Sequence, residues 1–391
     1  MSLLSAQIAS PVVQETLRRE MPVAERWSYF DHAAVGPLTR AAAESIKRYL
    51  SQCAESGDVH WPQWAAGVEQ TRSLAAAMIG ALPEEIALVH STTEGISLVA
   101  EGLDWRAGDN VVLPAGEFPT NVYPWLHLQS RGVEVRQVTM PGVVWDYQRL
   151  ADACDQRTRL ISCSWVGYAN GFRCDPAIIG QIARRVGAYF LLDAIQGLGV
   201  FPLDVKSVGV DFLSADGHKW MLSPEGAGMA YIRHELLDRL RPMVVGWNSV
   251  VGRFDFQNLN LQLRPEAARY EPGTQNMIGQ LAFGGSLRTL CQVGLSPTSW
   301  ALADQVLQSV SKLSRQLQKF GAEVLEIPEE CRSGIVMFQL PGLDATVVRQ
   351  RLLDEGVVVS CRGGRLRAAV HAYNDDADID RLTAVVEELL R

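Results

Sequence analysis

The chain has 391 residues, of which 47% are hydrophobic and 20% charged, and its formal net charge at pH 7 is −8. This length exceeds that of one ordinary domain and predicts two. Acidic and basic residues are interspersed without a basic run, and no apolar stretch reaches the roughly 18 residues of a membrane span, so neither nucleic acid nor a membrane is an expected partner.

Seven cysteines are spread along the chain, and none forms a Cys-x-x-Cys pair. An odd number at such wide spacing argues against a disulfide framework and against a structural zinc site. We therefore expect no metal site, and we expect the reducing cytoplasm as the location. The first residues have neither a basic start nor a long apolar segment, so they do not look like a secretory signal.

Short apolar runs alternate with helical patterns in the first three quarters of the chain. Apolar strands that alternate with helices are typical of a parallel sheet covered on both faces. The sequence thus predicts an α/β fold with a mostly parallel, seven-stranded sheet between layers of helices. The predicted strands are 86–89, 110–114, 133–138, 159–165, 188–193, 211–214 and 226–232, and the predicted helices are 5–20, 39–54, 61–80, a segment ending near 103, and 176–186.

From about residue 285 the pattern changes to long helices separated by few strands, which predicts a compact α+β domain. The large domain is predicted to span 17–285, and the smaller domain 1–16 together with 286–391. The elements expected in the smaller domain are helices at 301–319, 344–355 and 376–390 and strands at 334–339, 356–360 and 366–370.

A hydroxyl-rich turn, Ser91-Thr92-Thr93, follows the strand 86–89 and opens a helix. A strand, a turn and a helix in this order direct free backbone N–H groups and the positive end of the helix toward an anion. Thr92 and Thr93 are therefore predicted to contact a phosphate. Ser91 and Glu94 also fit a capping box, and both interpretations can hold because they use different donors.

Asp193 ends the strand 188–193, and Lys219 follows the strand 211–214 within Asp216-Gly217-His218-Lys219. A lysine can hold pyridoxal phosphate as a Schiff base, and a carboxylate can keep the pyridine nitrogen of the cofactor protonated. Each residue alone has a plainer interpretation, as a surface lysine or as a loop cap. Together, with Gln196 three residues after Asp193, they predict a cofactor site in which Lys219 forms the Schiff base.

From Tyr29 to about Arg381 the chain resembles the class V aminotransferase family, which includes cysteine desulfurases, selenocysteine lyases, isopenicillin N epimerase-like proteins and kynureninase. The motifs around Asp193 and Lys219 carry this resemblance. It implies the large domain of pyridoxal-phosphate fold type I, pyridoxal 5'-phosphate as the cofactor and an amino acid as the substrate.

The resemblance also implies contacts to the cofactor. Desulfurases have a ring-stacking histidine where this chain has Pro119, so the neighbouring Phe118 is expected to stack on the pyridine ring, with core packing as the alternative. Relatives often place a phosphate-binding serine at the position of Asp216. A carboxylate would repel phosphate, so Asp216 is expected to point away or to cap a turn, while Ser214 or His218 supplies the donor.

Four residues are expected to contact the substrate. Arg367 matches the arginine that grips the α-carboxylate, a task that suits a bidentate guanidinium, although an exposed edge position remains the alternative. His32 belongs to a segment that borders this carboxylate in the family, and a simple turn is its other interpretation. Either Tyr168 or Asn170 is expected to hydrogen-bond the cofactor or the substrate.

The turn Pro272-Gly273-Thr274 resembles a family turn that crosses a dimer interface to the phosphate of the neighbouring subunit. A homodimer is therefore expected, with Thr274 reaching the site of the second copy. On its own, the same tripeptide indicates only a turn.

The expected site serves transamination, racemisation, β-elimination and desulfuration alike, because its residues act on the carbanion at Cα. Desulfurases carry a nucleophilic cysteine on a mobile loop before the carboxylate arginine, whereas here the loop is short and Cys361 precedes Arg362. An inert thiol is thus favoured, and an aminotransferase- or epimerase-like enzyme is the leading expectation. A cysteine desulfurase or C–S lyase is the alternative, and a non-catalytic binding protein of this fold is disfavoured because Lys219 and Asp193 are both present.

Overall fold

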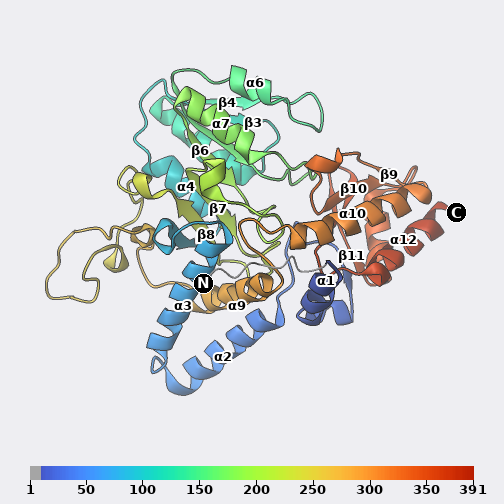
Figure 1. Ribbon diagram of the computed structural model, residues 1–391, viewed down its shortest axis with the longest axis horizontal. Coiled ribbons are helices and arrows are strands. Elements are labelled where there is room, and N and C mark those ends of the chain that lie inside the picture. Colours follow the sequence, from blue (N-terminus) through green and yellow to red (C-terminus); the bar gives the residue numbers. More distant parts are fainter. Residues whose placement is uncertain (1–9) are drawn as a thin grey trace.

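The computed structural model describes residues 10–391, which form a larger and a smaller lobe (Figure 1). The larger lobe contains a seven-stranded sheet in the order β2-β8-β7-β6-β5-β3-β4. In this sheet only β8 pairs antiparallel with its neighbours, so the other six strands end at the same edge and the predicted, mostly parallel sheet is confirmed. The strands are β2 (Ile86–Val89), β3 (Asn110–Pro114), β4 (Glu134–Val138), β5 (Thr158–Ser164), β6 (Tyr189–Asp193), β7 (Phe212–Asp216) and β8 (Gly228–Ile232).

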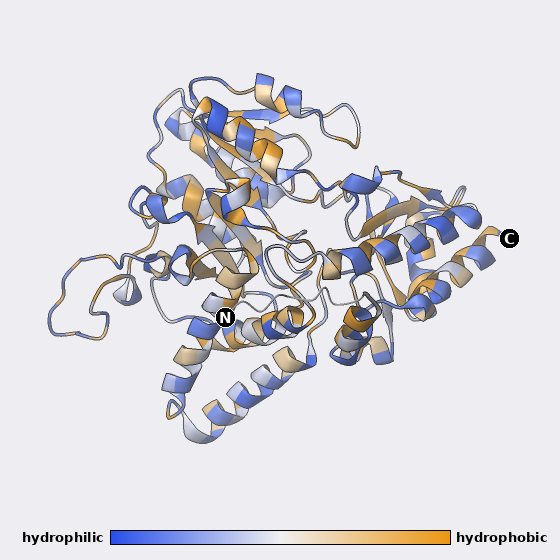
Figure 2. Cartoon of the chain, in the orientation of Figure 1, coloured by the Kyte–Doolittle hydropathy of each residue, from blue (hydrophilic) through white to orange (hydrophobic). Residues whose placement is uncertain are grey.

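Both faces of this sheet are buried. Alternate side chains of one strand enter two separate hydrophobic clusters, as Phe190 and Leu192 of β6 do on one face and Leu191 on the other. In Figure 2 the central strands are mainly orange, while the helices around them carry blue turns. The covering helices are α2 (Arg40–Ser56), α3 (Trp61–Met78), α4 (Thr92–Gly102), α5 (Tyr123–His127), α6 (Tyr147–Asp152), α7 (Pro176–Val186), α8 (Val205–Val208) and α9 (Met277–Gln292).

The smaller lobe contains an antiparallel sheet in the order β12-β13-β10-β9. The predicted strand 356–360 is instead two short strands, because β11 leaves this sheet and pairs with β1 near the N-terminus. The strands are β1 (Ser28–Tyr29), β9 (Glu323–Val324), β10 (Ile335–Gln339), β11 (Val357–Val358), β12 (Ser360–Arg362) and β13 (Arg365–Ala369), and the helices are α1 (Ser10–Arg19), α10 (Ala301–Lys319), α11 (Ala345–Asp354) and α12 (Asp376–Leu390).

The N-terminal helix α1 packs against the smaller lobe. Arg18 of α1 forms an ion pair with Asp378 of α12, with 2.7 Å between Nη1 and Oδ2. Residues 1–9 lie outside the described residues, so the predicted helix 5–20 and the assignment of 1–16 to the smaller domain can be followed only from Ser10 onward.

Helix α9 was not among the predicted elements, and it runs across residue 285, where the pattern changes. Most of its side chains are buried, and it packs between α2 and α3. A helix that is apolar on most of its surface lacks the one-sided pattern by which a surface helix is recognised.

Gly36 connects the N-terminal segment to the turn that carries Lys219. Its backbone N–H donates a hydrogen bond to the carbonyl oxygen of His218, with 2.6 Å between N and O. A Cβ atom at this position would lie 2.0 Å from the carbonyl oxygen of Lys219, a distance at which the backbone has to move. Only glycine allows this close approach, which holds Lys219 at the junction of the lobes.

Replacing Gly36 by alanine is expected to lower the free energy of unfolding by about 1–3 kcal/mol, because the added methyl group overpacks the backbone of Lys219. Chemical denaturation followed by tryptophan fluorescence measures this change. Gly273→Ala is the matched control, since a Cβ there meets nothing within 4 Å. Equal stabilities of the two variants would contradict the close packing at Gly36.

Candidate active site

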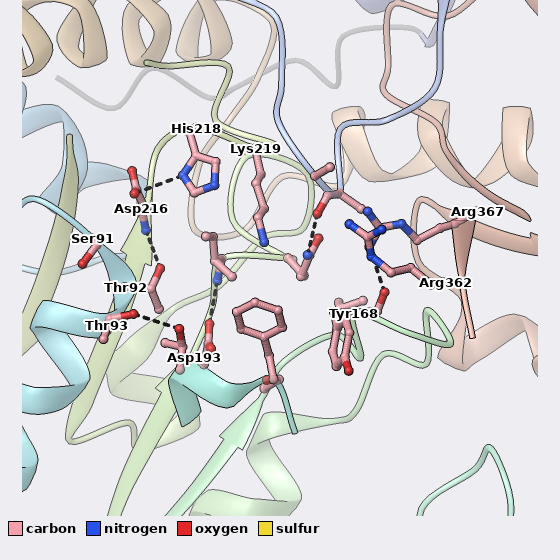
Figure 3. A pocket seen from close by; sticks show the side chains of 18 residues that line it. Ser91, Thr92, Thr93, Tyr168, Asp193, Asp216, His218, Lys219, Arg362 and Arg367 are labelled. Atoms are coloured by element: carbon pink, nitrogen blue, oxygen red, sulfur yellow. Dashed lines mark hydrogen bonds and ion pairs between the residues drawn. The ribbon is translucent and has the colours of Figure 1, made fainter. Parts of the chain in front are cut away.

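A cavity of about 270 Å³ lies at the carboxyl edge of the parallel strands, where the smaller lobe contacts the sheet (Figure 3). Segments that follow β2, β3, β5, β6 and β7 contribute to its wall, and β12 and β13 contribute two arginines. This is the edge at which ligands bind to open α/β sheets. The predicted site residues that line the cavity are Thr92, Thr93, Phe118, Tyr168, Asp193, Gln196, His218, Lys219 and Arg367.

Lys219 and Asp193 are both enclosed in this cavity, as predicted from their places after β7 and β6. Burial lowers the pKa of Lys219 to about 8, although the charge of Asp193 opposes this shift. Burial likewise raises the pKa of Asp193 to about 6, against the backbone N–H of Ile195, which donates to Oδ1 over 3.2 Å. Loss of solvent thus brings the pKa values of the amine and of the carboxyl group close to neutral pH.

Phe118 and Tyr168 form an aromatic wall next to the lysine. Their ring centroids are 5.1 Å apart in an edge-to-face arrangement, and Nζ of Lys219 lies 5.7 Å from the ring centroid of Phe118. The ring of Phe118 is 43% exposed, which excludes the core-packing alternative for this residue. An exposed aromatic face beside a buried amine is suited to contact a flat ligand.

The first turn of α4 lines one end of the cavity through hydroxyl groups. Ser91 caps the helix by accepting a hydrogen bond from the backbone N–H of Glu94 over 3.1 Å, and Thr93 Oγ1 lies 2.8 Å from Thr120 Oγ1. Thr92 Oγ1 accepts from the backbone N–H of Asp216 over 2.9 Å. Hydroxyl groups at a helix N-terminus are suited to bind an anion at this end of the cavity.

Asp216 lies at the wall of the cavity, and of the two expectations for it, the pairing of its carboxylate with His218 in the same turn agrees with the capping role. Its Oδ2 lies 3.0 Å from Nδ1 of His218, and these two side chains are drawn together in Figure 3. Ser214, the other expected donor, is not among the lining residues, because its hydroxyl donates to the carbonyl oxygen of Thr92 beneath the helix. Of the two expected donors, only His218 reaches the cavity.

Arg367 and Arg362 line the opposite end, as Figure 3 shows. Arg367 is buried, and its Nε donates to Ser360 Oγ over 3.1 Å, while Nη1 donates to the carbonyl oxygen of Tyr168 over 3.0 Å. Its Nη2 lies 3.4 Å from Oδ1 of Asp31. These contacts exclude the exposed edge position for Arg367.

His32 does not reach the cavity, unlike the two alanines that follow it. Its ring is fully buried, with Nδ1 2.7 Å from the carbonyl oxygen of Ala369 and Nε2 2.8 Å from the hydroxyl of Tyr373. It also stacks on Trp220, which in turn stacks on His371. The histidine therefore joins the lobes behind Lys219, and the expected substrate contact at this position is not present.

Two further expected residues lie elsewhere. Asn170 accepts a hydrogen bond from the backbone N–H of Phe172 over 3.1 Å within its own turn, and it is not a lining residue of the cavity. Thr274 lies in a different hollow, beside Trp61 and Trp247. In this chain, only Tyr168 of the Tyr168/Asn170 pair is placed to contact a bound ligand.

Arg362, which lines the cavity, and Glu117, which lies behind its wall, were not among the predicted site residues. Arg362 could have been found from the two-residue spacing of a strand, which puts it on the same face as Ser360. Glu117 lies behind the wall, where its Oε1 accepts from the backbone N–H of Ser164 over 2.7 Å, and burial raises its pKa to about 7.

Residues 28–382 match the aminotransferase class-V family model. A probable cysteine desulfurase of Methanothermobacter thermautotrophicus is 30% identical, covering 96% of this chain and 98% of the relative. A probable cysteine desulfurase of Pyrococcus abyssi is 26% identical, covering 97% and 98%. Both matches cover nearly the whole chain, and so they include both lobes.

Solved structures have the same fold. The apo cysteine desulfurase of Thermococcus onnurineus has a TM-score of 0.88 at 25% identity, covering 98% of this chain and 99% of that chain. The cystine C–S lyase C-DES in complex with cysteine persulfide has a TM-score of 0.84 at 24% identity, covering 93% and 97%. The second likeness concerns the fold alone.

Within residues 10–391, no helix is long and apolar enough to cross a membrane. The match to the family model covers most of the chain, and it agrees with the resemblance carried by Asp193 and Lys219. The chain belongs to the aminotransferase class-V family, a family of pyridoxal-phosphate-dependent enzymes.

Proposed function

We propose that this protein is a pyridoxal-phosphate-dependent lyase that cleaves the C–S bond of a sulfur-containing amino acid and releases the sulfur product from the cavity. Several relatives that match over nearly the whole chain are named cysteine desulfurase or probable cysteine desulfurase, and they favour C–S chemistry over the aminotransferase- or epimerase-like expectation. The position of Cys361, described below, then favours lysis over desulfuration.

The cavity fits the cofactor in its chemistry. Lys219 offers an amine of lowered pKa for covalent attachment, and Asp193 offers a buried carboxylate for the ring nitrogen. Thr92, Thr93 and His218 line the end suited to the phosphate. When bound, pyridoxal phosphate supplies an electron sink for the charge that forms as Cα loses its proton.

The residues of the chain have separate tasks in the proposed reaction. Arg367 holds the α-carboxylate and so orients the substrate, and Lys219 Nζ, which is a free amine once the substrate's amino group has replaced it on the cofactor, accepts the Cα proton. A pKa of about 8 leaves a substantial fraction of this amine neutral near pH 7.5, as a base requires. Loss of the proton and of the Cβ–S bond forms a Cα–Cβ double bond, and sulfur leaves with the electron pair. Water then releases ammonia and pyruvate when cysteine is the substrate.

Cys361 is the observation that separates lysis from desulfuration. Its Sγ donates to the carbonyl oxygen of Ala345 at the start of α11, over 3.3 Å. Its neighbours Ser360 and Arg362 face the other side of β12, toward Arg367 and the cavity. Burial also raises the pKa of the Cys361 thiol, which disfavours the reactive thiolate. This thiol is thus poorly placed to take sulfur from a substrate.

We expect cysteine to yield equal amounts of sulfide and pyruvate, with alanine at background level. Cys361→Ser is expected to retain the wild-type rate within about twofold, since the thiol takes no part. Sulfide, pyruvate and alanine are quantified together from one incubation. Alanine as the main product, together with inactivity of Cys361→Ser, would instead establish a desulfurase.

The buried amine gives a pH-dependent prediction. Its pKa of about 8 lies below the ordinary value of 10.5, so attachment of pyridoxal phosphate to the apoenzyme is expected to rise with pH through a midpoint near 8. Borohydride trapping followed by mass spectrometry measures the attached cofactor. Lys219→Ala is expected to abolish the mass increase, whereas Lys206→Ala, at an exposed lysine, leaves it unchanged. Trapping that persists in Lys219→Ala refutes the assignment of the lysine.

The proposed enzyme is a homodimer. The loop between β8 and α9 carries exposed apolar side chains, with Phe256 68%, Leu259 90% and Leu261 76% exposed, and it projects from the larger lobe in Figure 1. Trp247 and Thr274 lie together at the base of this loop. An apolar surface of this kind is typical of a protein interface, and a second copy would place Thr274 near the neighbouring phosphate end, as the resemblance implies.

Phe256→Asp is expected to convert the dimer into monomers, because a carboxylate cannot be buried in an apolar interface without loss of solvation. Light scattering after size-exclusion chromatography measures the mass. Thr274→Val is expected to leave the mass unchanged while it weakens the affinity for pyridoxal phosphate about tenfold, through loss of one hydrogen bond to a charged group. A wild-type monomer that binds the cofactor tightly would overturn both expectations.

We also propose a cytoplasmic location. All seven cysteines are free thiols in the structure, including the buried neighbours Cys163 and Cys174. Free thiols in this number are compatible with a reducing compartment.

A further inference from the structure

The hairpin formed by β12 and β13 carries arginines on the face that is turned toward the cavity. Arg362 pairs with Arg365 and Ser360 pairs with Arg367, so these four side chains share one face while Cys361 occupies the other. Gly363 and Gly364 both have positive φ values, of 56° and 75°, and they close the hairpin in two residues. The short turn fixes the positions of the arginines relative to each other.

The two arginines that line the cavity differ in their bonding. Arg367 donates to Ser360 and to the carbonyl oxygen of Tyr168, and it also faces Asp31. Arg362 donates only to the carbonyl oxygen of Cys361 over 2.7 Å, and within residues 10–391 it forms no ion pair. Within the described residues, Arg362 therefore lines the cavity with most of its N–H donors unpaired and without a carboxylate to balance its charge.

The positive charge of Arg362 affects the pKa values of other residues that line the cavity. It contributes to the lowered pKa of Lys219 and to the lowered pKa of Arg367, after the larger effect of burial. Repulsion between Arg362 and Arg367 costs free energy that an anion between or beside them would relieve. The α-carboxylate occupies Arg367 in the proposed function, which leaves the charge of Arg362 for a second anionic group.

We propose that Arg362 forms a second anion subsite, and that the preferred substrate is a cysteine whose sulfur carries a short substituent ending in a carboxylate. This inference rests on the proposed function and names its substrate class. Arg362 determines specificity, since it acts on the part of the substrate that leaves with sulfur.

The spacing of the hairpin agrees with such a substrate. Residues two apart on one side of a strand are separated by about 7 Å, and Arg362 is two positions from Ser360, the partner of Arg367. A chain of Cα, Cβ, sulfur and one further carbon connects two carboxylates over a comparable distance. Cysteine itself has no second carboxylate for Arg362 to bind.

The competing possibility is that both arginines grip the α-carboxylate. The two arrangements predict different responses to a change in the substituent. If Arg362 binds the substituent, its loss affects ligands with a terminal anion and spares their neutral analogues. If Arg362 binds the α-carboxylate, its loss weakens both kinds of ligand equally.

The test compares S-carboxymethyl-L-cysteine with S-carbamoylmethyl-L-cysteine, which differ only in a terminal carboxylate or amide. Calorimetry on the cofactor-loaded enzyme at low ionic strength measures the affinities of their deamino analogues, which cannot react. We expect the acid to bind about tenfold more tightly than the amide, as for one charge-assisted hydrogen bond, and Arg362→Gln to remove this preference. Arg362→Lys, which keeps the charge, is expected to restore part of it.

Arg365→Gln is the matched control, because it removes a positive charge from the same hairpin face at a residue that does not line the cavity. It is expected to keep the preference. Equal affinities of the acid and the amide for the wild-type enzyme, or equal losses for both in Arg362→Gln, would overturn the second subsite. Formation of pyruvate from the two cysteine derivatives is measured separately, so a failure of C–S lysis is distinguished from a failure of the subsite.

Discussion

The main constraint on this site is that a lysine and an aspartate are both buried in one cavity without forming an ion pair with each other. Lys219 and Asp193 are held in one cavity, and each loses solvent that would stabilise its charged form. Their pKa values consequently approach each other, to about 8 and about 6. A lysine in water is almost fully charged at neutral pH and is a poor base, so the environment that makes these residues costly to fold also gives Lys219 the pKa that the proposed proton transfer needs.

The cavity exists only because the two lobes are joined. The larger lobe provides the groups that follow the parallel strands, and the smaller lobe provides Arg362 and Arg367. The N-terminal segment makes the connection, since Gly36 contacts the backbone of the Lys219 turn while β1 pairs with β11. A ligand that touched both ends of the cavity would therefore contact both lobes.

The sheet, and the edge of it that carries the cavity, could be predicted because short apolar runs that alternate with helical patterns are typical of buried parallel strands. The roles of Asp193 and Lys219 could be predicted for the same reason, because each residue follows such a run. The side-chain contacts around the site could not be predicted from the sequence. The buried position of His32 depends on Ala369 and Tyr373, which are more than three hundred residues away in sequence, and the position of Asp216 depends on the hydrogen bond from its backbone N–H to Thr92 of another element. Contacts of this kind are decided by packing between elements, which the local pattern does not record.

The stacked rings of His32, Trp220 and His371 have a consequence for how the enzyme responds to acidity. Burial lowers the pKa of His371 to about 4, and it lowers the pKa of His32 well below its ordinary value. Both imidazoles thus stay uncharged throughout the range in which Asp193 and Lys219 exchange protons. A change of pH between about 6 and about 8 therefore alters the charge of Asp193 and Lys219, while the buried rings behind Lys219 keep their uncharged form.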